Sequence, residues 1–226
     1  MSKLNEKRRV KSPRNFAFRP VSEDVVNRAI KDLKPKKSSG LDGISQDFLR
    51  TISPVITLPL KHIINMSIRT GRFPTPWKRS KIIPLLKKGD PTEISNYRPI
   101  SCLPSASKVL EGVIEKQLRK YFEENDLLPM QQHGFRQNRS TTTALTSMVA
   151  DWVSNYEQGR HTGVLLWDLS AAFDTIDIDI LCKKLGIYGV DGRSVDFLRS
   201  FLTNREQRVL VGSALSDPIT TSVGCP

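Results

Sequence analysis

The sequence predicts an α+β fold, in which a mixed sheet has helices packed on one side. Two observations lead to this prediction. Hydrophobic residues make up 38% of the 226 residues, which is enough to bury a core in one large domain or two small ones. Segments with apolar residues at helical spacing also alternate loosely with short extended apolar runs.

The first third of the chain is predicted to be helical after a flexible arm. Residues 1–20 are basic, contain few apolar residues and include two prolines. Ser22 is expected to cap an amphipathic helix, and a short helix is expected over 45–51. A longer helix should cover 53–71, with Pro59 bending it or delaying its start.

The rest of the chain mixes the two kinds of element. Pro84 favours an edge position for the first strand, because proline cannot donate a hydrogen bond to a neighbouring strand. The second expected strand, over 163–167, leads directly into Asp168. The pattern predicts helices over 105–124, 140–158, 178–185 and 194–202, and strands over 80–88, 163–167, 207–211 and 219–223.

The formal charge of +12 is unevenly distributed. Residues 1–120 contain 26 lysines and arginines against 10 acidic residues, a net charge of +16, whereas residues 121–226 contain 9 against 13, a net charge of −4. This asymmetry fits a protein that binds a polyanion with its basic half and a cation with its acidic half. A surface made soluble by lysines would give the same composition.

Three cysteines and three histidines are widely scattered, and no two cysteines form a C-x-x-C pair. This spacing predicts neither a disulfide framework nor a zinc site. No apolar run approaches the ~18 residues of a membrane span, and the N-terminus lacks the apolar core of a secretory signal. We therefore expect no membrane partner and a cytoplasmic or nuclear location.

The stretch LLWDLSAAFDTI, residues 165–176, ends an apolar run on a carboxylate. A buried unpaired carboxylate is costly, so Asp168 should emerge at a strand tip, be protonated or face a cation. Taken alone, the stretch favours Asp168 as the cap of a following helix. Asp174, Asp177 and Asp179 are interpreted as turn and cap residues, because the Gly and Glu of a calcium loop are missing.

Six segments follow one another along the chain: KSSGLDGIS (37–45), WKRSKIIPLLKKGD (77–90), NYRPISCLPSASKVLE (96–111), QHGFRQNRSTTTAL (132–145), LLWDLSAAFDTI (165–176) and SVGCP (222–226). In this order and spacing they resemble the motifs of reverse transcriptases from non-long-terminal-repeat retrotransposons, the jockey-like group in particular. Each motif is only moderately specific, but six in order are not expected by chance.

The resemblance implies a right-hand polymerase fold, with this chain containing the fingers and a partial palm only. After the flexible basic arm 1–20, the implied parts are a helical N-terminal extension over 21–76, the fingers over 77–135 and the partial palm over 136–226. The palm would be truncated before the second catalytic carboxylate motif, an aromatic-Ala-Asp-Asp sequence that the chain lacks. The chain alone is therefore expected to be inactive.

The resemblance assigns Asp168 as a catalytic residue and metal ligand, one of three carboxylates that bind two Mg²⁺ ions. Magnesium favours carboxylate oxygens together with phosphate and water, and two ions can assist both the attacking hydroxyl and the leaving pyrophosphate. The implied partners are an RNA template, a DNA primer and deoxynucleoside triphosphates. The oligomeric state does not follow from the sequence.

The segment that follows Asp168 contains three residues, Ala171, Ala172 and Phe173, that match family positions close to the incoming nucleotide. Phe173 matches an aromatic residue that excludes the ribose 2′-hydroxyl and so selects deoxynucleotides. Without the family, Phe173 would be interpreted as a core residue. Ala171 and Ala172 match positions whose backbone faces the triphosphate, where small side chains permit close approach.

Arg98 matches a fingers arginine that grips the triphosphate, since a planar guanidinium can bind phosphate oxygens at two points. Lys87 is assigned as its partner, although Lys81 and Lys88 compete for that role. All three lysines could instead be ordinary charges on an edge strand.

Arg136 and Arg139 precede a capped helix and are assigned to template phosphates, with a solvated surface as the alternative. Lys108 and Tyr97 are further candidate template contacts. The predicted function is thus RNA-directed DNA polymerisation by a mobile element through two-magnesium nucleotidyl transfer. The alternative is a non-catalytic remnant that binds nucleic acid with its basic half.

Overall fold

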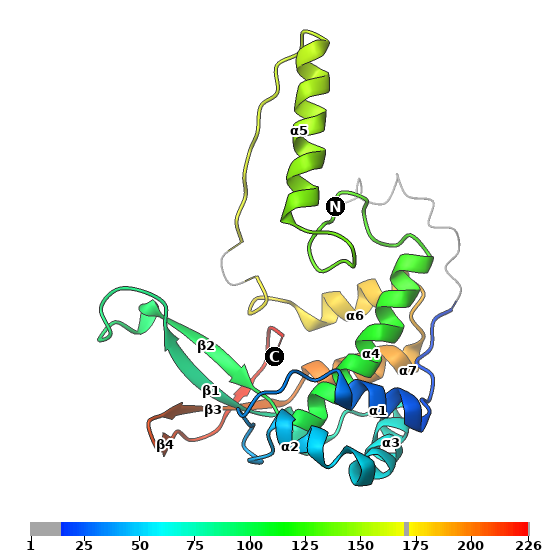
Figure 1. Cartoon of the computed structure of the whole chain (residues 1–226), viewed down its shortest axis with the longest axis vertical. Helices are drawn as coiled ribbons and strands as arrows, with labels where there is room; N and C mark the ends of the chain where they lie inside the picture. The colour runs from blue at the N-terminus through cyan, green and yellow to red at the C-terminus, as the bar shows by residue number, and fades with distance from the viewer. Residues whose placement is uncertain (1–14, 170–171, 226) are drawn as a thin grey trace. The chain divides into compact units, whose positions relative to one another are not determined.

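A computed structural model describes residues 15–169 and 172–225 (Figure 1). The chain divides into two compact units. The first contains the described residues up to Tyr121 together with those from Phe173 onward, and the second contains Phe122–Ala172. Helices occur in both units and a mixed sheet occurs in the first, so the predicted α+β character is confirmed.

Three helices open the first unit: α1 (Glu23–Lys31), α2 (Gln46–Thr51) and α3 (Ser53–Thr70). Their predicted positions are confirmed. The Ser45 hydroxyl caps α2 by accepting a hydrogen bond from the Phe48 N–H at 3.1 Å. Gly71 ends α3 with a φ of +65°, a conformation that glycine adopts without strain. Pro59 does not delay α3, which begins at Ser53.

The remaining helices of the first unit are α4 (Ser105–Glu124, which continues into the second unit), α6 (Ile178–Ile187) and α7 (Gly192–Leu202). The apolar stripes of α1, α3, α4 and α7 pack together as the main core, as their helical spacing predicts. Its most deeply buried apolar side chains are Val26, Ile30, Ile64, Val109, Leu110, Val113 and Phe197.

The flexible arm predicted for residues 1–20 does not extend to residue 20. The Phe16 N–H donates to Gly189 O at 2.8 Å, and the Phe18 N–H donates to Ser194 Oγ at 2.9 Å. Phe18 is 7% exposed and belongs to the main core. Two aromatic rings add enough buried apolar surface to offset the entropy of ordering this short segment.

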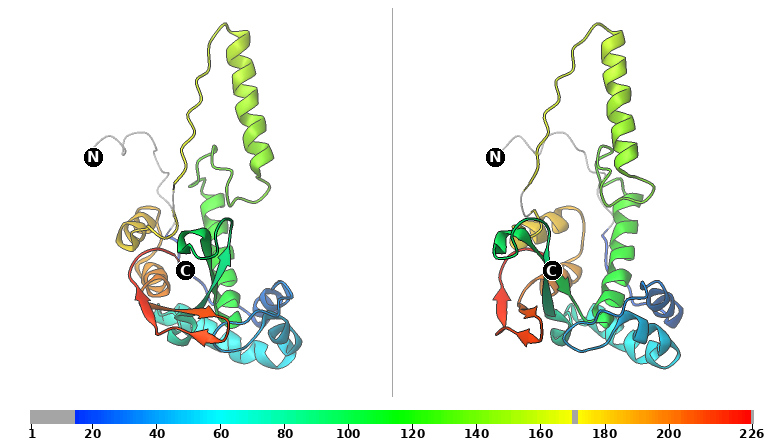
Figure 2. Two further views of the ribbon diagram at one scale, coloured as in Figure 1. Left: turned by 90° about the vertical axis from the view of Figure 1, so that its left-hand side faces the viewer. Right: turned by 60° about the vertical axis from the view of Figure 1, so that its left-hand side comes forward.

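The sheet of the first unit contains β1 (Arg79–Leu86), β2 (Tyr97–Cys102), β3 (Arg205–Val211), β4 (Ala214–Leu215) and β5 (Ile219–Thr221). β1 pairs antiparallel with β2 and parallel with β3, while β3 pairs antiparallel with β4 and β5. Short 3₁₀ helices at Thr75–Lys78 and Ile94–Asn96 precede β1 and β2. β1 and β2 extend away from the helices of their unit as a hairpin (Figures 1 and 2).

The predicted edge position of this strand is wrong, because β1 lies between β2 and β3. Proline is tolerated there since the pairing with β3 ends at Ile82, and Pro84 stands opposite Pro99 of β2.

Pro99 also explains why β2 was not predicted. A segment rich in charges and turn-forming residues, with proline in its middle, does not indicate a strand by its sequence alone.

The second unit contains one long helix, α5 (Thr141–Glu157). Ser140 and Thr143 form a reciprocal capping box at its start, and Gly159 follows its end with a φ of +69°. The extended chain that follows lies beside α5 (Figure 2). Side chains of both segments line an open groove of about 450 Å³. Within the described ranges, no helix is long and apolar enough to cross a membrane.

The strand predicted over 163–167 is not formed. Residues 160–169 are extended, but they pair with no other strand within the described part of the chain. Leu165, Leu166 and Trp167 are 74%, 84% and 83% exposed. A strand requires a hydrogen-bonding partner as well as a suitable sequence, and this segment has the sequence alone.

Candidate functional site

Asp168 follows the apolar residues 164–167 at the surface of the second unit, with its side chain exposed. Leu169 is not helical, and Ser170 and Ala171 lie outside the described residues, so the described part of the chain offers Asp168 no helix to cap. Across residues 15–169 and 172–225, no three His, Cys, Asp or Glu side chains gather as a set of metal ligands. The described chain therefore presents one carboxylate where the predicted site requires three.

Ala172 is exposed at the end of the second unit, and Ala171 lies outside the described residues. Phe173 belongs to the first unit, where its side chain is 58% exposed. Its carbonyl oxygen accepts a hydrogen bond from the Cys225 N–H at 2.9 Å. The ring is thus open to solvent while the backbone behind it is held, which argues against a core phenylalanine.

The aspartates that follow have structural roles. Asp177 caps α6 by accepting a hydrogen bond from the Ile180 N–H at 2.9 Å. Asp179 forms an ion pair with Arg199, which lowers the pKa of the Asp179 carboxyl. The interpretation of Asp177 as a cap is confirmed.

The β1–β2 hairpin places two predicted triphosphate ligands on one face. Arg98 stands opposite Leu85, and Lys87 follows Leu85 by two residues with its N–H bonded to Asn96 O at 2.8 Å. Since side chains alternate between the faces of a strand, Lys87 and Arg98 are diagonal neighbours. Both are exposed. Lys81, opposite Cys102, shares this face at the other end of β1.

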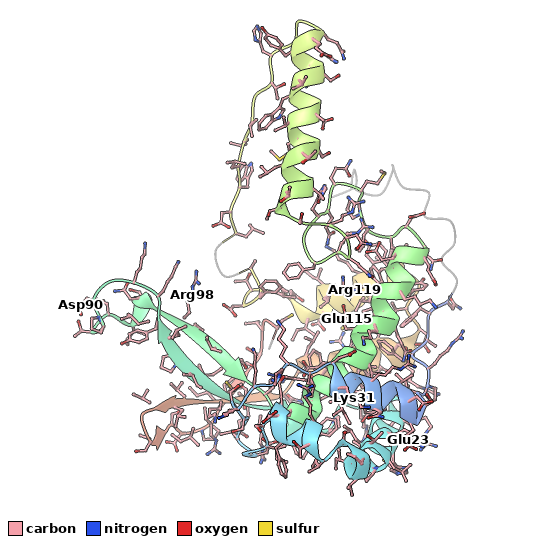
Figure 3. The ribbon with its side chains drawn as sticks, viewed as in Figure 1. Glu23, Lys31, Asp90, Arg98, Glu115 and Arg119 are labelled. Carbon is pink, nitrogen blue, oxygen red and sulfur yellow. The ribbon has the colours of Figure 1, made fainter. Side chains whose placement is uncertain are left out.

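The loop that joins β1 to β2 is held by its own side chains. The Asp90 carboxylate accepts hydrogen bonds from the Thr92 N–H at 2.8 Å and the Thr92 hydroxyl at 2.7 Å, which lower the pKa of Asp90. The Tyr97 hydroxyl donates to Pro91 O at 2.9 Å. Figure 3 shows Asp90 at the free end of the hairpin and Arg98 nearby. An ordered loop keeps the two cations at a defined separation from each other.

Lys108, a predicted template contact, is half-buried in α4. In the amide orientation that satisfies both neighbours, buried Gln46 accepts a hydrogen bond from Lys108 Nζ at 3.0 Å and donates to Lys34 O at 3.2 Å. Lys108 therefore links α4 to the start of α2, and its role toward a template stays a prediction.

Arg136 and Arg139 lie in the second unit and bind the loop that contains them. Arg136 forms a two-pronged ion pair with Glu123, with Nε 3.0 Å from Oε1, and donates to Pro129 O at 2.9 Å. The hydrogen bond to Glu123 raises the pKa of Arg136. Arg139 donates to Met130 O. These contacts occupy much of the donor capacity that was assigned to template phosphates, so that assignment stays a prediction.

Two buried cations were missed by the sequence reasoning. Lys78 is 7% exposed and Arg205 is 3% exposed. Lys78 Nζ donates to Thr203 O at 3.2 Å, and Arg205 Nη1 donates to Phe201 O at 2.7 Å. Burial lowers the pKa of both groups. Their sequence contexts look like ordinary charged turns, and nothing in them signals burial.

Known proteins are similar in sequence to this chain. The family described as "Reverse transcriptase (RNA-dependent DNA polymerase)" matches residues 85–226. A "Probable RNA-directed DNA polymerase from transposon BS" of Drosophila melanogaster is 31% identical over 219 residues, 94% of this chain and 23% of that protein. An "RNA-directed DNA polymerase from mobile element jockey" of Drosophila funebris is 32% identical over 158 residues, 70% of this chain and 17% of that protein.

A more distant relative is the "Retrovirus-related Pol polyprotein from type-1 retrotransposable element R2" of Popillia japonica. It is 27% identical over 198 residues, which are 86% of this chain and 26% of that protein. The chain thus spans about a quarter or less of the length of these relatives.

Proposed function

Because the chain belongs to the reverse transcriptase family, we propose that it forms part of an RNA-directed DNA polymerase of a non-long-terminal-repeat mobile element. In the proposed reaction, the 3′-hydroxyl of a DNA primer attacks the α-phosphate of a deoxynucleoside triphosphate. A new phosphodiester bond forms and pyrophosphate leaves. The substrates would be an RNA template, a DNA primer and deoxynucleotides, in the nucleus or cytoplasm.

The observation that carries the proposal is the family match over residues 85–226, which includes Asp168, Phe173 and Arg98. All three side chains are exposed and accessible to a substrate. In the proposed division, residues 21–76 form a helical extension, 77–135 the fingers and 136–226 a partial palm. The exposed cations of the β1–β2 hairpin support a triphosphate-binding role for the fingers.

Magnesium is the proposed cofactor, with Asp168 as one ligand. The described residues do not fit a two-ion site by themselves, because Asp168 has no companion set of ligands among them. A lone exposed carboxylate binds Mg²⁺ weakly, since the ion is well solvated and dehydrates reluctantly. We therefore infer that the 226-residue chain alone does not polymerise, and that the contribution of its residues is to bind and orient substrates.

The lack of companion ligands for Asp168 among the described residues favours one alternative, a nucleic-acid-binding protein without polymerase activity. The net charge of +16 over residues 1–120 would support such binding without any chemistry.

The deciding experiment places Asp168→Asn in a polymerase that contains this chain at the full length typical of its relatives. Removal of the charge should reduce primer extension by about 10³-fold or more while nucleic-acid binding is retained. Asp151→Asn, at an exposed position of α5, is the matched control and should retain activity. Unchanged extension by Asp168→Asn would refute the catalytic assignment, and no extension by the unsubstituted full-length protein would favour the alternative.

A further inference from the structure

The C-terminal segment, residues 222–225, lies against the Phe173 turn, residues 173–176, within the first unit. The Cys225 N–H donates to Phe173 O at 2.9 Å, and the Gly224 N–H donates to Ile176 O at 3.1 Å. The two bonds join both ends of the turn to consecutive residues of the segment. Close to fifty residues separate the two segments in sequence, so only the tertiary fold brings them together.

Gly224 makes the closest backbone approach at this contact. A Cβ added at Gly224 would stand 2.9 Å from Asp174 Cα and 2.9 Å from Asp174 O. Both are backbone atoms of the Phe173 turn, so a side chain at 224 could be accommodated only if the turn moved. The φ of Gly224 is +85°, which also favours glycine. Gly224 itself is buried, although its neighbour Val223 is exposed.

The Phe173 side chain at this contact is exposed on one side, where a ligand can reach it. Phe173 is 58% exposed, and its backbone carbonyl is the atom held by Cys225. A ring that discriminates between sugars by contact must stand at a defined distance from the sugar, and a displacement of about 1 Å alters such discrimination. The position of the ring follows its backbone, and two hydrogen bonds from the C-terminal segment reach the turn that contains it.

We propose that Gly224 is a specificity-determining positioning residue, which sets the place of the Phe173 ring by allowing the C-terminal segment to dock on the Phe173 turn. The proposal rests on the proposed role of Phe173 in excluding ribonucleotides. Gly224 touches neither nucleotide nor metal in this scheme and acts only through the backbone of residues 173–176.

The first test uses the 226-residue chain labelled with 4-fluorophenylalanine, with the Phe173 resonance assigned by its loss in Phe173→Leu. Gly224→Ala should shift or broaden the Phe173 fluorine signal and leave the signals of core phenylalanines in place. Gly212→Ala is the matched control, because Gly212 also has a positive φ, +60°, but no atom within 4 Å of an added Cβ. An equal effect of the two substitutions, or none on Phe173, overturns the proposal.

A second variant covers the case in which Gly224→Ala does not fold. A chain that ends at Val223 lacks both hydrogen-bond donors and introduces no clash. Its Phe173 signal should narrow and move toward that of a solvated residue if docking holds the turn, and an unaltered signal overturns the proposal.

The second test measures discrimination in a polymerase that contains this chain at the length of its relatives. Gly224→Ala should raise the ratio of ribonucleotide to deoxynucleotide efficiency by roughly tenfold with Phe173 intact, whereas Gly212→Ala should not. A ratio changed by Phe173→Ala but not by Gly224→Ala overturns the role of Gly224 and leaves the proposed function standing. A ratio unchanged by both refutes the sugar-excluding role itself, and the inference with it.

Discussion

Lys78 and Arg205 lie buried at the same end of α7, where their side chains donate hydrogen bonds to the carbonyl oxygens of Thr203 and Phe201. The C-terminal end of a helix carries partial negative charge, which stabilises cations placed against it. The Arg205 guanidinium also lies over the Phe201 ring, with Cζ 5.0 Å from the centroid. This arrangement ties the residue before β1 and the first residue of β3 to the end of α7 in the first unit.

The first prediction concerns the pH dependence that Lys78 introduces. Burial lowers the pKa of Lys78 from its usual 10.5, so folding penalises the charged form. At pH values between the pKa of Lys78 in the folded chain and its pKa in the unfolded chain, the unfolded chain binds more protons. The free energy of unfolding should therefore rise as the pH increases through this range. Urea denaturation should show the wild-type chain gaining stability relative to Lys78→Met as the pH rises toward 10.5. Lys37→Met, at an exposed lysine, controls for loss of a charge, and a pH-independent difference contradicts the prediction.

The second prediction concerns Phe173. Because the side chain is 58% exposed, Phe173→Ala should lower the unfolding free energy by about 1 kcal/mol or less, well below the 3–5 kcal/mol typical of a core phenylalanine. Phe197→Ala, at a core residue with 2% exposure, supplies the comparison. Thermal melting of the two variants is the measurement. Equal losses would show that Phe173 packs as a core residue and would argue against its contact with a sugar.

The third prediction is that the chain binds RNA or single-stranded DNA with affinity that falls as salt rises, because lysines and arginines displace counterions from phosphates. The magnitude of the slope of log K against log salt concentration should fall by about 0.7 for each phosphate contact with a single strand that is removed. When no triphosphate is bound, the exposed cations Lys87 and Arg98 of the basic half are available to strand phosphates, so Lys87→Ala combined with Arg98→Ala should reduce the slope by about 1.4. Lys78→Met removes a buried charge and should leave it unchanged. A flat salt dependence of the wild-type chain would exclude the basic half as the contact surface.

The fourth prediction is that Arg136 holds its loop. Arg136→Lys keeps the charge but loses the two-pronged pairing with Glu123 and the bond to Pro129 O. Limited proteolysis should cut within residues 129–139 several-fold faster than in the wild-type chain. The Arg160→Lys variant, substituted in the same unit but outside this loop, should be cleaved at the wild-type rate. If Arg136→Lys weakens nucleic-acid binding with no change in proteolysis, then Arg136 serves phosphates rather than the loop.

Local signals in the sequence predicted most helices well. Ser45 and Ser140 act as caps, Gly71 and Gly159 mark helix ends, and α4 occupies the whole predicted range. These features succeed because caps, glycine conformations and apolar periodicity act within a few residues. Strands were predicted less well, since β2 and β4 were missed and the strand at 163–167 does not form.

By itself the sequence determined the family, through six ordered motifs, and the helical elements of the fold. It also identified Asp168, Phe173 and Arg98 as candidates, since residue type and spacing suffice for that. Only the tertiary structure decided that Lys87 and Arg98 share a face, that Arg136 binds Glu123, and that Gly224 meets Asp174. Such relationships depend on strand register and on close approaches between residues distant in sequence. Burial of Lys78 is decided in the same way, because a buried cation is tolerable only where it finds a partner, and the Thr203 carbonyl at the end of α7 is 125 residues away in sequence.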